Sequence, residues 1–321
     1  MNITEPEATI GRLDRAGIPG PAALFSRAAW GVLAYNVLVV LWGALVRATG
    51  SGAGCGGNWP TCNGQVIPSL QTTATVIEYT HRLMSGLAIL AVGGLWWWSR
   101  RAFPNSHRAR WWAGLATVLL AIEALLGAGL VLFDYVAHNA SIGRGFYLAA
   151  HLANTQLLLG ALTMTAWTAT RGKALLRAAV PGSLQVALPL AIVLSMTGAV
   201  AALGDTLFPA PSFVAGLAQE FAPATHFLLR LRMAHPPLAI LLGLFLLYAA
   251  SSVVRVRPSA PVKRTAAAVA VLVLAQLLAG ALNVALAAPV SMQLVHLLLA
   301  NLLWIALVLM TAHAAAAEQR S

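Results

Sequence analysis

The chain has 321 residues, of which 59% are hydrophobic and 9% are charged, and its mean hydropathy is +0.78. Soluble domains carry about 25% charged residues, so this composition excludes an ordinary soluble protein and indicates a polytopic membrane protein in the lipid bilayer. The net charge of +11 would suit a nucleic-acid-binding protein, but the basic residues lie in short segments between apolar runs. We therefore expect no nucleic-acid partner.

Eight apolar runs are long enough to cross the bilayer core, which needs about 20 helical residues. They lie at 28–46, 77–98, 111–132, 147–169, 184–204, 235–254, 266–287 and 290–312. The polar residues before the first run contain no apolar segment next to a cleavage site, so we expect the first helix itself to direct insertion. The predicted fold class is all-α, with eight transmembrane helices arranged as two parallel-repeat four-helix bundles.

The distribution of Lys and Arg predicts the orientation. Of the 20 basic residues, 15 lie in the two terminal segments and in the loops near 99–110, 170–183 and 255–265. Arg82 lies inside the second run, and the opposite loops hold only Arg47, Arg144, Arg230 and Arg232. The positive-inside rule then places both termini in the cytoplasm, and we expect a multi-pass protein of the cell membrane.

The only two cysteines lie in the glycine-rich stretch "RATGSGAGCGGNWPTCNGQVIP" at 47–68. The predicted orientation places this loop outside the cytoplasm, where thiols can be oxidised. Cys55 and Cys62 can then close a short disulfide loop. Two free cysteines are the alternative. A zinc site is disfavoured because the loop offers no His or acidic residue to complete four ligands.

The two halves of the chain resemble each other. The matching stretches are HRLMSGLAIL from His81 and HPPLAILLGL from His235, EALLGAGLV from Glu123 and QLLAGALNV from Gln276, and HLANTQLLLG from His151 and HLLLANLLWI from His296. Four helices per copy is an even number, so both copies insert in the same orientation, as a parallel repeat about an axis along the membrane normal.

This repeat predicts the domain organisation. The expected segments are a cytoplasmic tail at 1–27, a first half at 28–170 with the extracellular cysteine loop at 47–76, a cytoplasmic linker at 171–183, a second half at 184–312 and a cytoplasmic tail at 313–321.

Four of the eight histidines lie inside predicted spans: His81, His151, His235 and His296. Each follows the outer end of its helix by a few residues, so all four lie at one depth. Ionisable groups inside a membrane are rare and usually functional. Two imidazoles per four-helix unit suit the axial ligation of haem iron, whereas zinc or copper would need further ligands. We therefore predict one tetrapyrrole site in each half.

The halves differ at one acidic position. Glu78 precedes His81 by three residues and shares its helix face, whereas the second half has Leu231 or Arg232 there. A carboxylate beside one haem only predicts that the first site performs chemistry and that the second carries electrons. The alternative is an interfacial residue paired with Arg82 or Arg47.

Further charged residues lie near the two predicted sites. Arg82, Arg230 and Arg232 are candidates for contacts with haem propionates. Glu123 lies deeper in its helix, and its counterpart is the neutral Gln276. For Glu123 we expect a structural role within the bundle.

Several motifs together resemble the haem A synthase family. They are "GALVRATGSGAGCGGNWPTCNGQVIP", "EYTHR", and the histidines of "AAHLANTQ", "RMAHPPLA" and "QLVHLLLAN". The resemblance covers residues 28–312. It implies eight transmembrane helices in two homologous halves and an enzyme that oxidises the C8 methyl group of haem O to a formyl group, which gives haem A for cytochrome oxidase.

The resemblance also implies roles for individual residues. His81 and His151 would be the axial ligands of the substrate haem O, and Glu78 the catalytic glutamate. The cofactor haem b would have His235 and His296 as its iron ligands, and the cysteine pair marks one subgroup, in which it is redox-active or structural. The implied partners are a haem O synthase and an electron acceptor of unknown identity. A homo-oligomer is left open.

Three other functions compete with this interpretation. A dihaem b-type electron-transfer protein would retain both haems tightly, and the asymmetric Glu78 disfavours it. A transporter would have broken helices and polar groups at the midplane. A thiol–disulfide oxidoreductase would normally use a C-x-x-C pair and would leave the histidines without a role.

Overall fold

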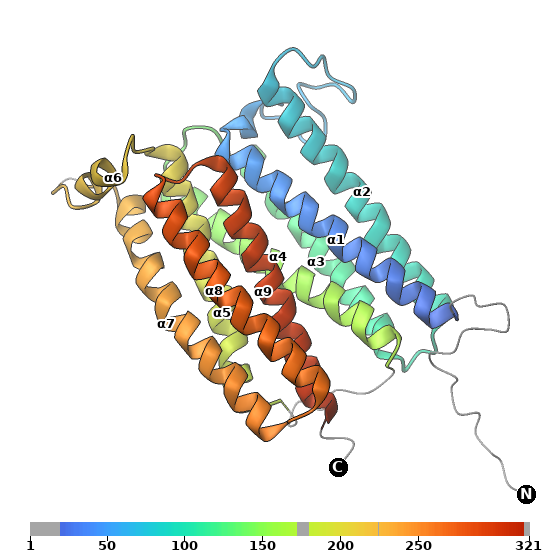
Figure 1. Ribbon diagram of the computed structural model, residues 1–321. Coiled ribbons are helices and arrows are strands. Elements are labelled where there is room, and N and C mark those ends of the chain that lie inside the picture. Colours follow the sequence, from blue (N-terminus) through green and yellow to red (C-terminus); the bar gives the residue numbers. More distant parts are fainter. Residues whose placement is uncertain (1–19, 172–179, 224, 318–321) are drawn as a thin grey trace, which may run out of the picture.

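The computed structural model describes residues 20–171, 180–223 and 225–317, and this part of the chain is helical. The helices are α1 (Pro21–Ala48), α2 (Thr73–Ala102), α3 (Arg108–Leu132), α4 (Ile142–Ala169), α5 (Gly182–Leu207), α6 (Phe213–Glu220), α7 (Phe227–Val256), α8 (Ala260–Ala285) and α9 (Val290–Ala317), with a 3-10 turn, η1, at Ser51–Ala53. The eight long helices lie roughly parallel in one bundle, and α1 begins at the same end at which α9 finishes (Figure 1). The cysteine loop and α6 lie at the opposite end.

Helix ends follow local capping chemistry rather than the limits of the apolar runs. The side chains of Thr72 and Ser141 accept hydrogen bonds from the first turns of α2 and α4, which satisfies backbone donors that a helix start leaves free. Most helices therefore extend beyond the predicted spans. Residues 21–27 belong to α1 rather than to a tail, and residues 227–234 belong to α7 rather than to a loop. The tail before residue 20, most of the linker and the last residues lie outside the described part.

Six of the described helices are long and apolar enough to cross a membrane: α1, α3, α5, α7, α8 and α9. This agrees with a multi-pass helical membrane protein. Helices α2 and α4, with 30 and 28 residues, are as long as these six helices but are more polar. On α2 the polar residues include Glu78, Arg82 and, in its last turn, Arg100 and Arg101.

Helix α4 is polar because it lies in the middle of the bundle. It packs against α1, α3, α5 and α9, and from Leu158 to Ala169 every residue is buried. Threonine hydroxyl groups of α4 form hydrogen bonds within the helix: Thr163 donates to the carbonyl of Leu159, and Thr165 donates to the carbonyl of Ala161. A helix surrounded by other helices needs no apolar surface toward lipid, so its hydropathy understates its depth in the bundle.

Helix contacts are repeated between the first half (α1–α4) and the second half (α5 and α7–α9). In the first half the contacting pairs are α1·α2, α2·α3, α3·α4 and α1·α4, and in the second half the matching pairs are α5·α7, α7·α8, α8·α9 and α5·α9. Between the halves, α4·α5 matches α1·α9, and the equivalent helices α4 and α9 meet each other. At that junction Gln156 Nε2 donates to Oδ1 of its counterpart Asn301 at 3.3 Å. This pattern is that of a two-fold pseudo-symmetric bundle.

Candidate haem site

Each of the four histidines predicted to bind haem packs against a glycine of the preceding long helix. The pairs are His81 on Gly43, His151 on Gly127, His235 on Gly198 and His296 on Gly280. A Cβ atom added to Gly43, Gly198 or Gly280 would lie 3.1 Å from the imidazole, and one added to Gly127 would lie 3.9 Å from it. The same histidine–glycine contact therefore occurs four times, at matching positions in both halves.

In the second half, the rings of His235 on α7 and His296 on α9 face each other, with centres 6.4 Å apart and planes at 83°. With metal–imidazole bonds of about 2 Å, two rings on opposite sides of one iron have centres roughly 6 Å apart. The Thr197 hydroxyl lies 2.9 Å from His235 Nδ1, and the Gln276 amide nitrogen lies 3.1 Å from His296 Nε2. This pair of rings fits an axially ligated haem.

In the first half, the matching histidines are His81 on α2 and His151 on α4. The buried Nδ1 atom of His81 has no hydrogen-bond partner among the described residues. His151 Nδ1 lies 3.1 Å from Glu123 Oε1 on α3. A buried imidazole nitrogen without a partner is costly unless a ligand uses the ring, so this half also fits a haem.

Glu78 lies one helical turn before His81 and is only 4% exposed. Its Oε2 atom accepts a hydrogen bond from the backbone N–H of Cys55 at 2.8 Å, and its Oε1 atom accepts one from Arg82 at 2.5 Å. The predicted alternative of an ion pair with Arg82 is therefore present, but the carboxylate is buried under the cysteine loop rather than exposed at an interface. The second half has no acid at the matching position.

The cysteine loop is closed by a disulfide between Cys55 and Cys62, and both residues are buried. Arg82 on α2 donates to the carbonyls of Asn58 and Thr61 in this loop. The loop also requires glycine at Gly54, since a Cβ atom there would lie 2.4 Å from the backbone of Ala74. The loop thus covers the N-terminal end of α2 and contacts Glu78.

The structure gives the three candidate propionate arginines different surroundings. Arg82 is already engaged by Glu78 and the cysteine loop. Arg232 forms ion pairs with Asp205 at 3.0 Å and with Glu220 of α6 at 2.7 Å. Arg230 is exposed, and its guanidinium donates to the carbonyl of Pro223 at 3.5 Å.

Arg47 was treated in the sequence as a loop charge and as an alternative partner of Glu78, but its guanidinium binds other residues. It lies in the last turn of α1 and donates to the second half: to the Ala202 carbonyl at 2.5 Å, to the Thr206 hydroxyl at 2.6 Å and to Gln293 Oε1 at 2.8 Å. The only sequence signal was a cation directly at the end of an apolar run. Its partners are more than 150 residues away, so no local pattern predicts them.

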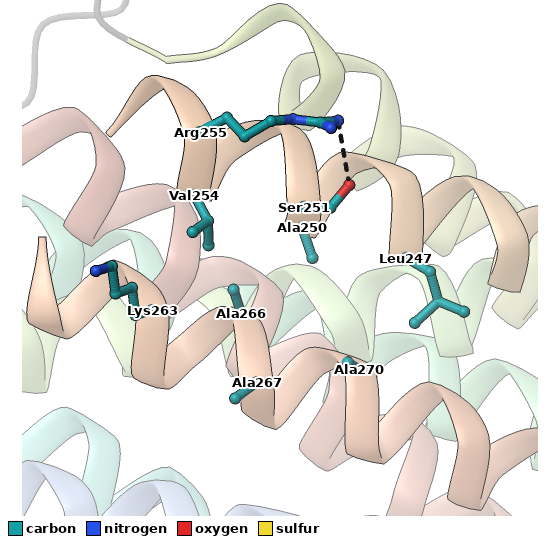
Figure 2. Close-up of a pocket in the computed structure, with 9 residues that line it drawn as sticks. All are labelled: Leu247, Ala250, Ser251, Val254, Arg255, Lys263, Ala266, Ala267 and Ala270. Atoms are coloured by element: carbon teal, nitrogen blue, oxygen red, sulfur yellow. Dashed lines mark hydrogen bonds between the residues drawn. The ribbon is translucent and has the colours of Figure 1, made fainter. Parts of the chain in front are cut away.

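Other features of the described residues do not form a site. No group of three or more His, Cys, Asp or Glu side chains with metal-site geometry occurs in this part of the chain. A groove of about 360 Å³ lies between α7 and α8, lined mainly by small and aliphatic side chains with Arg255 and Lys263 among them (Figure 2). It contains none of the predicted site residues.

The fold and the site define a multi-pass helical membrane protein with two matched pairs of histidines on its helices. The chain belongs to the family of cytochrome oxidase assembly proteins whose model, COX15-CtaA, matches residues 26–308. The resemblance to haem A synthases seen in the motifs is confirmed by this match and by the relatives described next.

Similar curated proteins carry two different names. A Thermus thermophilus protein named protoheme IX farnesyltransferase is 51% identical over 290 residues, which are 89% of this chain and 48% of that protein. The heme A synthase of Alkalihalophilus pseudofirmus is 43% identical over 99 residues, 30% of this chain and 33% of that protein. The heme A synthase of Halalkalibacterium halodurans is 38% identical over 128 residues, which are 39% of this chain and 42% of that protein. The matches thus span about half of these relatives or less.

Proposed function

We propose that this chain is a haem A synthase, an enzyme that oxidises the C8 methyl group of haem O to a formyl group and so supplies haem A to cytochrome oxidase. The observation that carries the proposal is the asymmetry of the two histidine pairs: a buried carboxylate, Glu78, lies beside the first pair only. Family membership and the relatives named heme A synthase support the same function.

In this proposal the first half binds the substrate haem O, with His81 and His151 as axial ligands. Glu78 is the catalytic residue. Conversion of a methyl group and one water molecule to a formyl group releases four electrons and four protons, and removal of the first electrons builds positive charge on the carbon. A carboxylate fixed nearby stabilises that charge or takes up the released proton. The hydrogen bonds from the Cys55 backbone and Arg82 hold the Glu78 carboxylate in one orientation.

The second half binds the cofactor haem b through His235 and His296. When bound, this haem supplies one-electron transfer, which removes electrons from the substrate site. The chain's contribution is to hold both imidazoles: the Thr197 hydroxyl contacts Nδ1 of His235, and Gly198 and Gly280 leave room for the two rings.

We propose further that all eight long helices cross the cell membrane, with both termini in the cytoplasm and the cysteine loop outside. Helix α4 tolerates its polar residues because it is surrounded by helices, and α2 because its charged residues pair with each other and with the cysteine loop. The basic residues support the orientation, since 15 of the 20 lie in the terminal segments and loops that the sequence assigns to the cytoplasmic side.

The name of the Thermus relatives favours a second candidate, farnesyl transfer to protohaem. Such a reaction needs Mg²⁺ and a diphosphate, which proteins bind through clustered carboxylates. This chain has only three aspartates, Asp14, Asp134 and Asp205, at distant positions. We therefore propose that a protohaem farnesyltransferase, which makes haem O, is the supplier of substrate to this chain rather than its own activity.

The substitution Glu78→Gln tests the proposal. It keeps the shape of the side chain and removes its charge, so we expect haem O to be bound but not oxidised. Asp134→Asn is the matched control, because Asp134 is exposed in the loop after α3 with a positive φ of 55° that Asn also accepts. The measurement is the haem composition of purified protein produced together with a protohaem farnesyltransferase. Full conversion by the Glu78→Gln protein would end the proposed role.

A further inference from the structure

The two halves differ in the residue that contacts their second histidine. In the first half the Glu123 carboxylate lies 3.1 Å from His151. In the second half the repeat places Gln276 there, and its amide nitrogen lies 3.1 Å from Nε2 of His296, whereas Glu123 lies at Nδ1 of His151. One imidazole therefore faces a carboxylate and the other a neutral amide.

The surroundings of Glu123 are those of an ionised carboxylate. Its Oε2 atom accepts a hydrogen bond from Asn154 Nδ2 at 2.5 Å, and its Oε1 atom accepts one from the Thr155 hydroxyl. Both donors lie on α4, one turn beyond His151, and Asn154 is further fixed by the carbonyl of Leu119 at 2.9 Å. Charge-assisted hydrogen bonds of this kind favour the anion.

These donors exist only in the first half. The residues of α9 that match Asn154 and Thr155 are Leu299 and Ala300, which have no polar side-chain atoms. The carboxylate and the two groups that hold it thus form one set that the second half lacks entirely. A residue that merely ties two helices together would not need its partners to differ between halves.

We propose that Glu123 is a positioning residue that makes His151 an electron-rich ligand and so lowers the reduction potential of the iron in the first half relative to that in the second. The inference rests on the proposed haem ligation by His151. A carboxylate that accepts the second N–H of a metal-bound imidazole raises the basicity of that ligand, and hydrogen bonding to an axial ligand is one of the ways in which a protein sets a haem potential.

The proposed difference in reduction potential sets the direction of electron transfer between the halves. An electron lost by ferrous iron in the first half is gained by ferric iron in the second, because the iron with the higher potential takes the electron. The substrate is oxidised in the first half under the proposed function. Glu123 and Gln276 would therefore direct electrons away from the site of chemistry.

Two reciprocal substitutions in the full-length, haem-loaded protein test the inference. Glu123→Gln gives the first half the residue of the second, and Gln276→Glu does the reverse. The readout is the midpoint potential of each haem in a spectroelectrochemical titration, with the low-spin resonance of each iron to tell the two sites apart. We expect Glu123→Gln to shift the first haem to a more positive potential and leave the second unchanged. Gln276→Glu should shift the second haem to a more negative potential, and Asp134→Asn should shift neither.

The outcomes separate this inference from the proposed function. Unchanged potentials in Glu123→Gln overturn it, and so does loss of the first haem alone, because Glu123 would then secure the imidazole rather than tune it. If Glu123→Gln does not fold, Gln276→Glu decides: a lower second potential supports the inference and an unchanged one overturns it. The expected shifts without any haem O oxidation in the wild-type protein would leave the inference standing and contradict the synthase activity.

Discussion

At the scale of single residues, the geometry of the site depends on glycines as much as on histidines. Each imidazole predicted to bind haem lies against a glycine of the neighbouring helix, and three of these contacts leave no room for a Cβ atom without a shift. Close-packed interiors transmit such a shift, since a side chain that moves slightly displaces its neighbours. The glycines therefore fix the positions of the four imidazoles.

Substitution of Gly198 tests this dependence. Gly198→Val would push against His235, whose Cε1 atom lies 3.1 Å from the added Cβ position, so we expect the second half to lose its haem while the first keeps its own. The control is Gly31→Val on α1, where nothing lies within 4 Å of the added atom. Haem content per chain is the measurement, and two retained haems in Gly198→Val would contradict the account.

The sequence singled out the candidate site residues more readily than their contacts in the fold. The four histidines, Glu78 and the cysteine pair stand out because polar and reactive residue types are rare in an apolar chain. The backbone N–H of Cys55 that binds Glu78, and the contact of Glu123 with His151, join residues 23 and 28 positions apart. Such contacts depend on how helices and loops pack, which no local pattern encodes.

At the scale of elements, the cysteine loop and α2 act as one unit. The loop contributes a backbone donor to Glu78 and accepts hydrogen bonds from Arg82, so the order of the loop and the orientation of the Glu78 carboxylate are linked. A cross-link between residues seven positions apart stabilises by roughly 2 kcal/mol. Its main effect is local, on the loop that covers α2.

Replacement of both cysteines by serine should loosen this unit. We expect faster amide hydrogen exchange across 50–66 and slower haem O oxidation, with both haems still bound, because the histidines lie on helices that the loop does not form. A membrane-impermeant reductant added to the wild-type protein should reproduce the effect. Unchanged exchange and activity would mean that the loop has no part in positioning Glu78.

Helices α2 and α4 also mark the limit of hydropathy as a guide. The apolar runs predicted all eight long helices, and the termini of most differ because caps, not bilayer thickness, end a helix. Helix α6 was not predicted, since eight residues are too short for a periodic pattern to stand out.

At the scale of the whole molecule, hydrogen bonds join the two halves both in the interior of the bundle and at the C-terminal end of α1. Gln156 and Asn301 join α4 and α9 in the interior, and Arg47 joins α1 to the second half at that end. The sequence predicted the internal repeat. It did not predict the contact that Arg47 makes with the second half, because Arg47 has no counterpart there with which a pattern could be compared.

Removal of the Arg47 contacts should weaken the junction between halves. Arg47→Met leaves three partly buried acceptors without their donor, at a cost of roughly 3 kcal/mol, so we expect a lower unfolding temperature in detergent. Arg230→Met is the control, because Arg230 is exposed and the hydrogen bond from its guanidinium to Pro223 is long. Equal unfolding temperatures for the two variants would rule out a role for Arg47 in joining the halves.

The central claim is that one half binds a haem that is chemically changed and the other a haem that is kept. The most direct measurement is extraction and chromatography of the haems from purified protein produced together with a protohaem farnesyltransferase. The account predicts haem b together with haem O, haem A or a hydroxylated intermediate. Haem b alone, at two per chain and without exchange, would contradict it and identify an electron-transfer protein instead.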